Sequence, residues 1–223
     1  MIEIIPAIIP QNLNIIREKF DKVFGLVKKV QVDILDGSYT SVKTWPFRDS
    51  QYEEMRKIAA GEEKFPHLGD FILEIDMMVI HPTNYLSDFI SLGAKSFVIH
   101  IDRNDYTKEC FQIIKEAGCR IGLGVKPSED ISLFGYFLPE VDFVQFMGND
   151  KIGHSGVDLD ESVLEKIKDF HQKYPKIAVQ IDIGVNEETI PKLKSAGVSR
   201  FVSGSSIFTA PNIKERITKL QNF

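Results

Sequence analysis

The strongest constraint on the fold is an alternation of short aliphatic runs with amphipathic segments along the whole chain. A short apolar run is typical of a buried strand, whereas apolar residues three or four positions apart are typical of a surface helix. The strand candidates are residues 2–9, 29–35, 71–80, 95–101, 119–125, 141–146, 176–183 and 200–204. Helical patterns lie between several of them, at 84–94, 106–118, 159–174 and 186–197. This order predicts parallel strands joined by crossover helices.

Eight such units predict an α/β fold, a (β/α)8 TIM barrel in which residues 1–223 form a single domain. A doubly wound open sheet is the alternative. It is less favoured because such a sheet usually carries a glycine-rich nucleotide motif after its first strand, whereas here residues 10–13 read Pro-Gln-Asn-Leu. Residues 38–50 and 61–70 are predicted to be loops around a short helix.

Charge and hydropathy exclude several classes of partner. The net charge is −5, and lysine and arginine are scattered among acidic residues, which leaves no basic field for nucleic acid or anionic lipid. No apolar run approaches the roughly 20 residues that span a bilayer, and the first residues lack the features of a signal peptide. We expect a cytoplasmic protein that acts on a small molecule. Cys110 and Cys119 lack metal-site spacing and are expected to be reduced core residues.

Polar residues interrupt the predicted strands at a period of two. The sets that share a face are Gln31 with Asp33, Glu74 with Asp76, His100 with Asp102, and Gln180 with Asp182 and Gly184. Active sites of barrels form at the C-terminal ends of the strands, where these residues lie. Several carboxylates on one rim repel one another unless a cation or a shared proton neutralises them. The pattern therefore predicts a functional site in which Asp33 and Asp182 are the strongest candidates, while His100 fits a structural role equally well.

Small residues near the C-terminus indicate a phosphate site. The stretch FVSGSSIF (201–208) reads as a strand that runs into a short helix, whose free backbone N–H groups suit an anion. The glycines after the sixth and seventh strands offer further backbone with no side chain in the way. The predicted phosphate-binding residues are Gly153, Gly156, Gly184, Gly204 and Ser205.

These motifs together resemble the ribulose-phosphate 3-epimerase family over nearly the whole chain. VDILDG (32–37) is similar to that family's VDxMDG, IDMMV (75–79) to HxMV, GVKP (124–127) to LKP, and FMGNDKIGHSG (146–156) to the mobile loop with NPGFGG. IDIGVN (181–186) is similar to VDGGxN, and AGVSRFVSGSSIF (196–208) to AGAxxxVxGSxIF.

The resemblance implies an isomerase and a homo-oligomer. In that family two aspartates act as an acid/base pair on opposite faces of a ketose phosphate, and two histidines join them around a divalent metal. The aspartates correspond to Asp33 and Asp182. This chain differs from the family at four of its functional positions. Gln31 and Asp76 stand where the family has histidines, Ala7 where it has a serine, and Ile183 where it has a glycine. The loop after the sixth strand is one residue longer.

The residue types suggest which metal and which reaction to expect. The predicted ligands are Gln31, Asp33, Asp76 and Asp182, whose hard oxygen atoms favour Mg²⁺ or Mn²⁺ over Zn²⁺. A metal-free site is the alternative. Met77, Met147 and His100 are expected to contact the sugar. The expected reaction is epimerisation of a ketose phosphate, ribulose 5-phosphate to xylulose 5-phosphate, in the pentose phosphate pathway. The alternatives are a non-catalytic or regulatory phosphosugar-binding barrel and a Schiff-base aldolase that uses Lys126.

Overall fold

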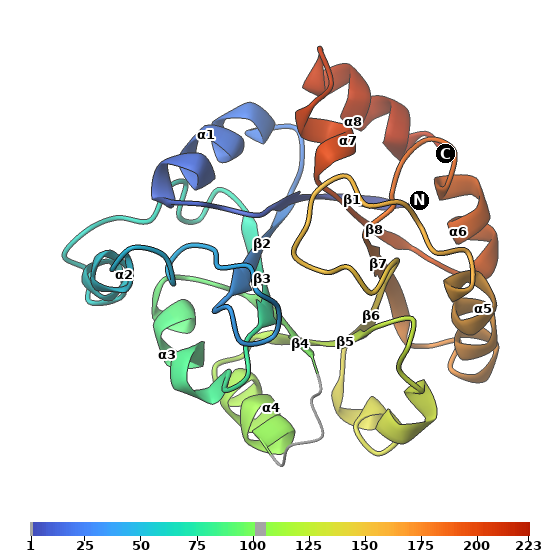
Figure 1. The fold of residues 1–223 in the computed structure, drawn as a ribbon. Coiled ribbons are helices and arrows are strands. Elements are labelled where there is room, and N and C mark those ends of the chain that lie inside the picture. Colours follow the sequence, from blue (N-terminus) through green and yellow to red (C-terminus); the bar gives the residue numbers. More distant parts are fainter. Residues whose placement is uncertain (1, 101–105) are drawn as a thin grey trace. The chain divides into compact units, whose positions relative to one another are not determined.

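Eight parallel strands pair in sequence order and close into a barrel (Figure 1). The computed structural model describes residues 2–100 and 106–223. Its strands are β1 (Glu3–Ile8), β2 (Lys29–Leu35), β3 (Ile72–Met78), β4 (Ser96–His100), β5 (Arg120–Val125), β6 (Phe143–Met147), β7 (Ala178–Asp182) and β8 (Arg200–Ser203). The predicted barrel is therefore confirmed, and the open sheet is not formed. The predicted strand limits agree with the observed ones to within about two residues. Asp102, which the sequence predicts to share a face with His100, lies outside the described residues.

Helices follow most of the strands, as expected for crossover connections. They are α1 (Leu13–Val23), α2 (Tyr52–Ala59), α3 (Thr83–Ser91), α4 (Tyr106–Glu116), α5 (Val163–Lys173), α6 (Ile190–Ala196), α7 (Ser205–Phe208) and α8 (Ile213–Gln221). Two 3₁₀ turns, Ile131–Phe134 and Leu138–Glu140, take the place of a helix between β5 and β6. The short helix predicted between loops 38–50 and 61–70 is α2.

The chain forms two compact units, which we describe separately. The first unit comprises residues 7–121, and the second comprises residues 1–6 together with 122–223. Strand β1 contributes to both, because its first residues pair with β8 and its last residues pair with β2. A single domain over 1–223 stays a prediction.

The first unit has an aromatic core beneath its helices. Trp45, Phe20, Phe89, Phe97 and Phe111 are among its fully buried side chains. Every residue of β2 is buried, which fits a strand with helices outside it and polar residues on its inner face. Burial of this kind contributes roughly 25 cal/mol per Å² of apolar surface, so the core fixes the position of the polar residues that alternate with it.

In each unit, a glycine in the left-handed conformation follows one of the helices. Gly197 follows α6 with a φ of 114°, and Gly118, which follows α4 of the first unit, has a φ of 67°. A glycine in the left-handed conformation commonly ends a helix, because it lacks a Cβ atom.

Cys110 and Cys119 of the first unit are buried free thiols, as predicted. Burial raises the pKa of Cys110 to about 12, so this thiol is unreactive.

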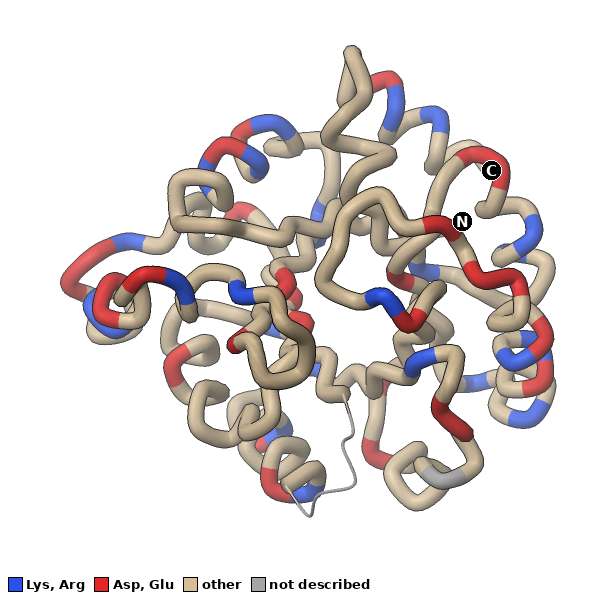
Figure 2. The backbone as a smooth tube through the Cα atoms, viewed as in Figure 1, with Lys and Arg blue, Asp and Glu red and all other residues tan. Residues whose placement is uncertain are grey.

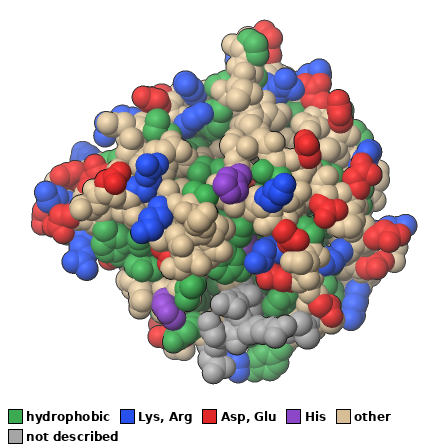
Figure 3. Space-filling model, in the orientation of Figure 1, with side chains coloured by type: hydrophobic (Ala, Val, Ile, Leu, Met, Phe, Trp, Pro, Cys, Tyr) green, Lys and Arg blue, Asp and Glu red, His purple; other side chains and the backbone are tan. Residues whose placement is uncertain are grey.

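Charges of both signs are interspersed on the surface. Lysine, arginine and acidic residues alternate along the helices in Figure 2, and no field of one sign covers the face shown in Figure 3. Among the described residues, no helix is long and apolar enough to cross a membrane.

Candidate active site

In the first unit, the polar residues of β2 and β3 lie on one face, as the period of two predicts. The register pairs Gln31 with Glu74 and Asp33 with Asp76. All four side chains are buried, with Asp33 only 4% exposed. Buried charged residues need partners, and the structure supplies them at two levels along the strands.

The upper level contains the predicted catalytic residue Asp33 and an aspartate–histidine pair. Gln31 donates its side-chain N–H to Asp33 Oδ1 at 3.1 Å. His100 Nε2 lies 2.6 Å from Asp76 Oδ1, and both side chains are almost completely buried. His100 therefore has the structural partner that the sequence allowed, although a role in substrate contact stays a prediction. The partner of Asp76 is an imidazole from the next strand.

The lower level is an ion pair that the sequence reasoning missed. Lys29 Nζ lies 3.2 Å from Glu74 Oε2, and Ser96 Oγ donates to the same oxygen at 2.7 Å. Lys29 is only 3% exposed. Extending the period of two backwards from Gln31 would have placed Lys29 on the inner face. These two contacts hold the Glu74 carboxylate in the interior, one layer away from Asp33.

In the second unit, Asp182 ends β7 beside the end of β6. Asp182 pairs in register with Met147 and is 8% exposed. Its Oδ1 accepts the N–H of Ile183 at 2.8 Å, and its carbonyl accepts the N–H of Gly148 at 2.6 Å. One layer below, Gln180 donates to Gln145 at 2.6 Å. The carboxylate is therefore oriented by the turn that follows it.

That turn has a strained backbone. Ile183 has a φ of 76° and Gly184 a φ of 75°, and a β-branched residue rarely adopts this conformation. The turn is enclosed: a Cβ on Gly148 would come within 2.2 Å of the Ile183 carbonyl oxygen, and one on Gly184 within 2.6 Å of Leu159 N. Close contacts at Gly148 and Gly184 thus surround the strained residue Ile183.

The predicted phosphate-binding residues occupy three segments of the second unit. Gly153 and Gly156, both with positive φ, lie in the loop after β6. The neck of that loop is closed by Asp160 N–H, which donates to the Gly148 carbonyl at 2.7 Å. Gly204 precedes the four-residue helix α7, which begins at Ser205. Phosphate binding by these residues stays a prediction.

Two of the predicted sugar contacts differ in their position on the strands. Met147 shares the face of Gln145, which donates to its sulfur at 3.5 Å. Met77 alternates with Asp76 and Met78 along β3 and therefore faces away from Asp76. Met78, rather than Met77, shares the face that carries the aspartate, because one step along a strand reverses the side-chain direction.

The arrangement does not present a formed metal site. In residues 2–100 and 106–223, no group of three or more histidine, cysteine, aspartate or glutamate side chains is placed to hold a metal ion. Two predicted ligand oxygens already bind other side chains, Asp33 Oδ1 with Gln31 and Asp76 Oδ1 with His100. Each of these carboxylates has a second oxygen atom, so binding of a metal by these residues stays a prediction.

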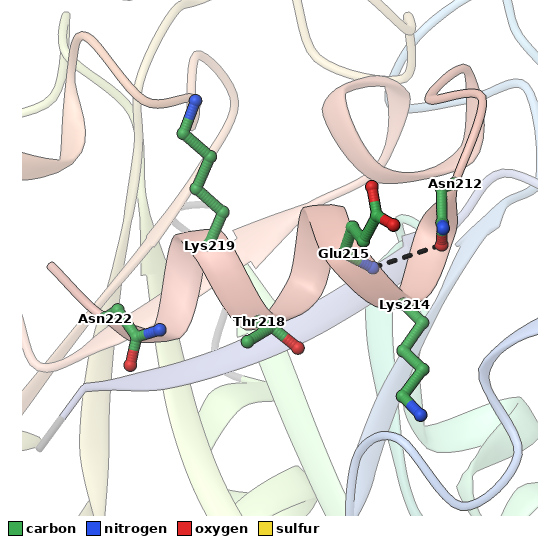
Figure 4. Close-up of a pocket in the computed structure, with 6 residues that line it drawn as sticks. All are labelled: Asn212, Lys214, Glu215, Thr218, Lys219 and Asn222. Atoms are coloured by element: carbon green, nitrogen blue, oxygen red, sulfur yellow. Dashed lines mark hydrogen bonds between the residues drawn. The ribbon is translucent and has the colours of Figure 1, made fainter.

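Two further features contain none of the predicted metal ligands or phosphate-binding residues. Lys126 Nζ lies 3.8 Å from Glu129 Oε1, so its environment is an ion pair and not the apolar pocket that activates a Schiff-base lysine. A depression along α8 contains none of the predicted site residues, and its side chains point in different directions (Figure 4). Its lining residues are Asn212, Lys214, Glu215, Thr218, Lys219 and Asn222.

Comparison with known proteins gives consistent matches. Residues 3–208 match the model of the ribulose-phosphate 3 epimerase family. Ribulose-phosphate 3-epimerase of Eremothecium gossypii is 25% identical over 195 residues, covering 86% of this chain and 80% of that protein. The Aquifex aeolicus protein of that name is 29% identical over 172 residues, covering 74% and 77%. The Escherichia coli K12 protein of that name is 26% identical over 154 residues, covering 67% and 68%.

Solved structures show the same fold at lower identity. KGPDC from Streptococcus mutans matches with a TM-score of 0.72 and 14% identity, over 98% of this chain and 95% of that one. The 3-hexulose-6-phosphate synthase from Salmonella typhimurium matches with a TM-score of 0.68 and 18% identity, over 99% and 97%. These likenesses support the barrel alone. The match over residues 3–208 shows that the chain belongs to the ribulose-phosphate 3-epimerase family.

Proposed function

We propose that this protein is an epimerase of a ketose phosphate and that it interconverts ribulose 5-phosphate and xylulose 5-phosphate. Membership of the family over residues 3–208 is the observation that carries the proposal. The two buried aspartates support it, because Asp33 lies near the end of β2 in the first unit and Asp182 ends β7 in the second. Barrel enzymes place their reacting groups at such strand ends.

The proposed reaction removes the C3 proton and returns it to the opposite face of the carbon. One aspartate acts as the carboxylate base while the other, protonated, acts as the acid. Their roles exchange with the direction of the reaction. The enediolate that forms between the two steps carries negative charge on oxygen and needs hydrogen-bond donors or a cation nearby.

The phosphate is proposed to bind in the second unit. Gly184, Gly204 and Ser205 are proposed to offer main-chain N–H groups to the phosphate, and Gly204 immediately precedes the first residue of α7. Gly153 and Gly156 are proposed to contribute from the loop after β6, which is the proposed lid. No step depends on a metal. If one binds, the oxygen-rich donors favour Mg²⁺ or Mn²⁺ over Zn²⁺.

Proton exchange tests this function directly. The protein is treated with chelator, supplied with ribulose 5-phosphate in heavy water with and without Mg²⁺, Mn²⁺ or Zn²⁺, and followed by NMR for deuterium at C3. Asp33→Asn and Asp182→Asn are each expected to slow exchange about 10²–10⁴-fold, whereas Asp169→Asn, on the surface of α5, serves as the matched control. Unchanged exchange in either site variant would refute the two-base assignment.

A regulatory phosphosugar-binding barrel is the second candidate. The observation that favours it is the lack of a metal-holding group among the described residues, with Asp76 bonded to His100 instead. Tight binding of ribulose 5-phosphate without exchange under every metal condition would support this candidate over the epimerase. A homo-oligomer and a cytoplasmic location are proposed from the family resemblance and the sequence, and sedimentation measures the former.

A further inference from the structure

The loop after β2, residues 36–45, starts and ends at the same point of the first unit. Asp36 and Lys43 form an antiparallel bridge across it, and the N–H of Thr44 donates to the carbonyl of Leu35 at 3.0 Å. In Figure 1 this loop is the blue segment that folds back after β2. We call it the β2 loop. Its neck is fixed to the strand that carries the first proposed catalytic residue.

Thr44 makes the attachment specific. Its hydroxyl donates to the Asp33 carbonyl at 2.9 Å and accepts the N–H of Leu35 at 2.9 Å. The side chain is 1% exposed, so both of these bonds are shielded from water. A buried hydroxyl used as donor and acceptor at once sets the position of both partners. The main chain around Asp33 and the neck of the β2 loop therefore hold one another.

The apex of the β2 loop contains two local hydrogen bonds. Ser38 N–H donates to Asp36 Oδ1 at 2.8 Å, and Val42 N–H donates to Thr40 Oγ1 at 3.1 Å. Both bonds are local, joining residues two positions apart in the chain. Small loops with a fixed neck and local contacts at the apex open at low energetic cost.

Tyr39 lies at this apex and reaches the buried histidine. Its ring centroid is 5.7 Å from that of His100, with the planes tilted by 56°. His100 is bonded to Asp76 on its other side, so the imidazole lies between a carboxylate and an aromatic ring. Tyr39 is half-buried, whereas His100 and Asp76 are buried. The tyrosine is therefore the most exposed member of this set.

We propose that Tyr39 is a positioning residue: the apex of the β2 loop closes on a bound sugar phosphate, and the Tyr39 ring then holds His100 toward the reacting end of the ligand. The inference rests on the proposed function. It assigns the aromatic ring, and not the phenol hydroxyl, as the part of Tyr39 that acts. Tyr39→Phe therefore keeps the effect and Tyr39→Ala removes it.

Histidine NMR and exchange kinetics together test the inference. The chain has five histidines, and His100→Asn assigns the His100 ring signals. Ribulose 5-phosphate is titrated into wild type, Tyr39→Phe, Tyr39→Ala and the surface control Tyr136→Ala, whose residue is 69% exposed. The only tryptophan, Trp45, adjoins Thr44 at the neck and is 1% exposed, so unchanged tryptophan fluorescence shows that each variant keeps the neck intact.

The expected result has two parts. Ligand shifts the His100 signals in wild type, Tyr39→Phe and Tyr136→Ala, and Tyr39→Ala loses this shift. In Tyr39→Ala, kcat for C3 exchange falls about ten- to a hundred-fold, as for a misplaced reacting group, while KM stays within about three-fold because the phosphate contacts lie elsewhere.

Other results would overturn it. A ligand-induced His100 shift that is the same in Tyr39→Ala and wild type excludes the inference, as does an equal loss of kcat in Tyr39→Phe. If wild type exchanges no C3 proton but binds the sugar phosphate, the proposed function fails, and the His100 shift alone then decides for or against Tyr39. If wild type binds no ribulose 5-phosphate, both proposals fail.

Discussion

Removing one partner of the Lys29–Glu74 ion pair is predicted to destabilise the protein far more than removing both. The pair lies in the interior of the first unit, with side chains 3% and 0% exposed, and Ser96 donates to the same glutamate oxygen. Lys29→Met takes the ammonium group away from the buried Glu74 carboxylate. A buried charge that loses its counter-ion costs about 3–5 kcal/mol of the free energy of unfolding.

The double variant Lys29→Met/Glu74→Leu removes both charges together. Replacing a buried pair by apolar side chains of similar size is neutral or stabilising in comparable cases, so the double variant is expected within about 1 kcal/mol of wild type. The single variant would lower Tm by roughly 6–20 °C, from about 2–4 °C per kcal/mol for a chain of this size. The exposed pair Lys192–Glu161 is the contrast, with a value of about 0–1 kcal/mol.

Urea unfolding of five proteins measures these differences. The set is wild type, Lys29→Met, Glu74→Leu, the double variant, and Lys192→Met as the surface control. We expect a coupling free energy of about 5–10 kcal/mol between positions 29 and 74, because each single variant leaves one buried charge without its partner whereas the double variant leaves none. A double variant that loses as much stability as the two single variants added together would refute the reasoning, because the charges would then contribute independently.

Three further predictions concern single positions. Ile183→Gly relieves a left-handed backbone strain of about 1–2 kcal/mol and adds a glycine entropy cost of about 0.5–1 kcal/mol. The urea midpoint of this variant should therefore stay the same or rise. A marked fall in the midpoint would contradict the presence of strain at Ile183. Gly122→Ala places a Cβ 2.3 Å from the Phe143 ring and should cost about 1–3 kcal/mol by thermal unfolding; an unchanged Tm shows that the ring moves freely. His67 lies between two carboxylates, the nearer at 2.7 Å, and bonding to Asp21 raises its pKa. The contribution of His67 to the free energy of unfolding is therefore complete below pH 6.5 and is lost as the pH rises through the raised pKa. Urea midpoints measured at about pH 6 and about pH 9 should differ more in wild type than in His67→Gln. Equal differences in the two proteins would exclude the effect.

The strands and the polar face of the first unit could be predicted because both follow from side-chain alternation. Residues 29–35 form β2 with the predicted limits, and the face that carries Gln31 and Asp33 continues in β3. A buried strand has no freedom to rotate, since one step would place aliphatic side chains inward and aspartate against the helices.

The partners of those residues could not be predicted from the same pattern. Glu74 binds Lys29 and Ser96, and this choice depends on the register between three strands, which alternation within one strand does not fix. Thr44 lies in a loop with no periodicity, and nothing in its sequence neighbourhood indicates that its hydroxyl binds the main chain of β2. Met77 as a sugar contact stays a prediction, although alternation along β3 places its side chain on the face opposite Asp76.

The division of β1 between the two units has a consequence for the order in which the chain folds during synthesis. Residues 7–121 have their pairing partners available once they leave the ribosome, since Ala7 pairs with Gln31 nearby in the sequence. Glu3 pairs with Arg200, which is 197 residues away, so the first six residues wait for almost the entire chain. Closure of this contact is a late step with a high loop-closure cost. Residues 3–6 are thus made long before the residues with which they pair, and an unpaired β1 edge is the segment that a chaperone would need to protect.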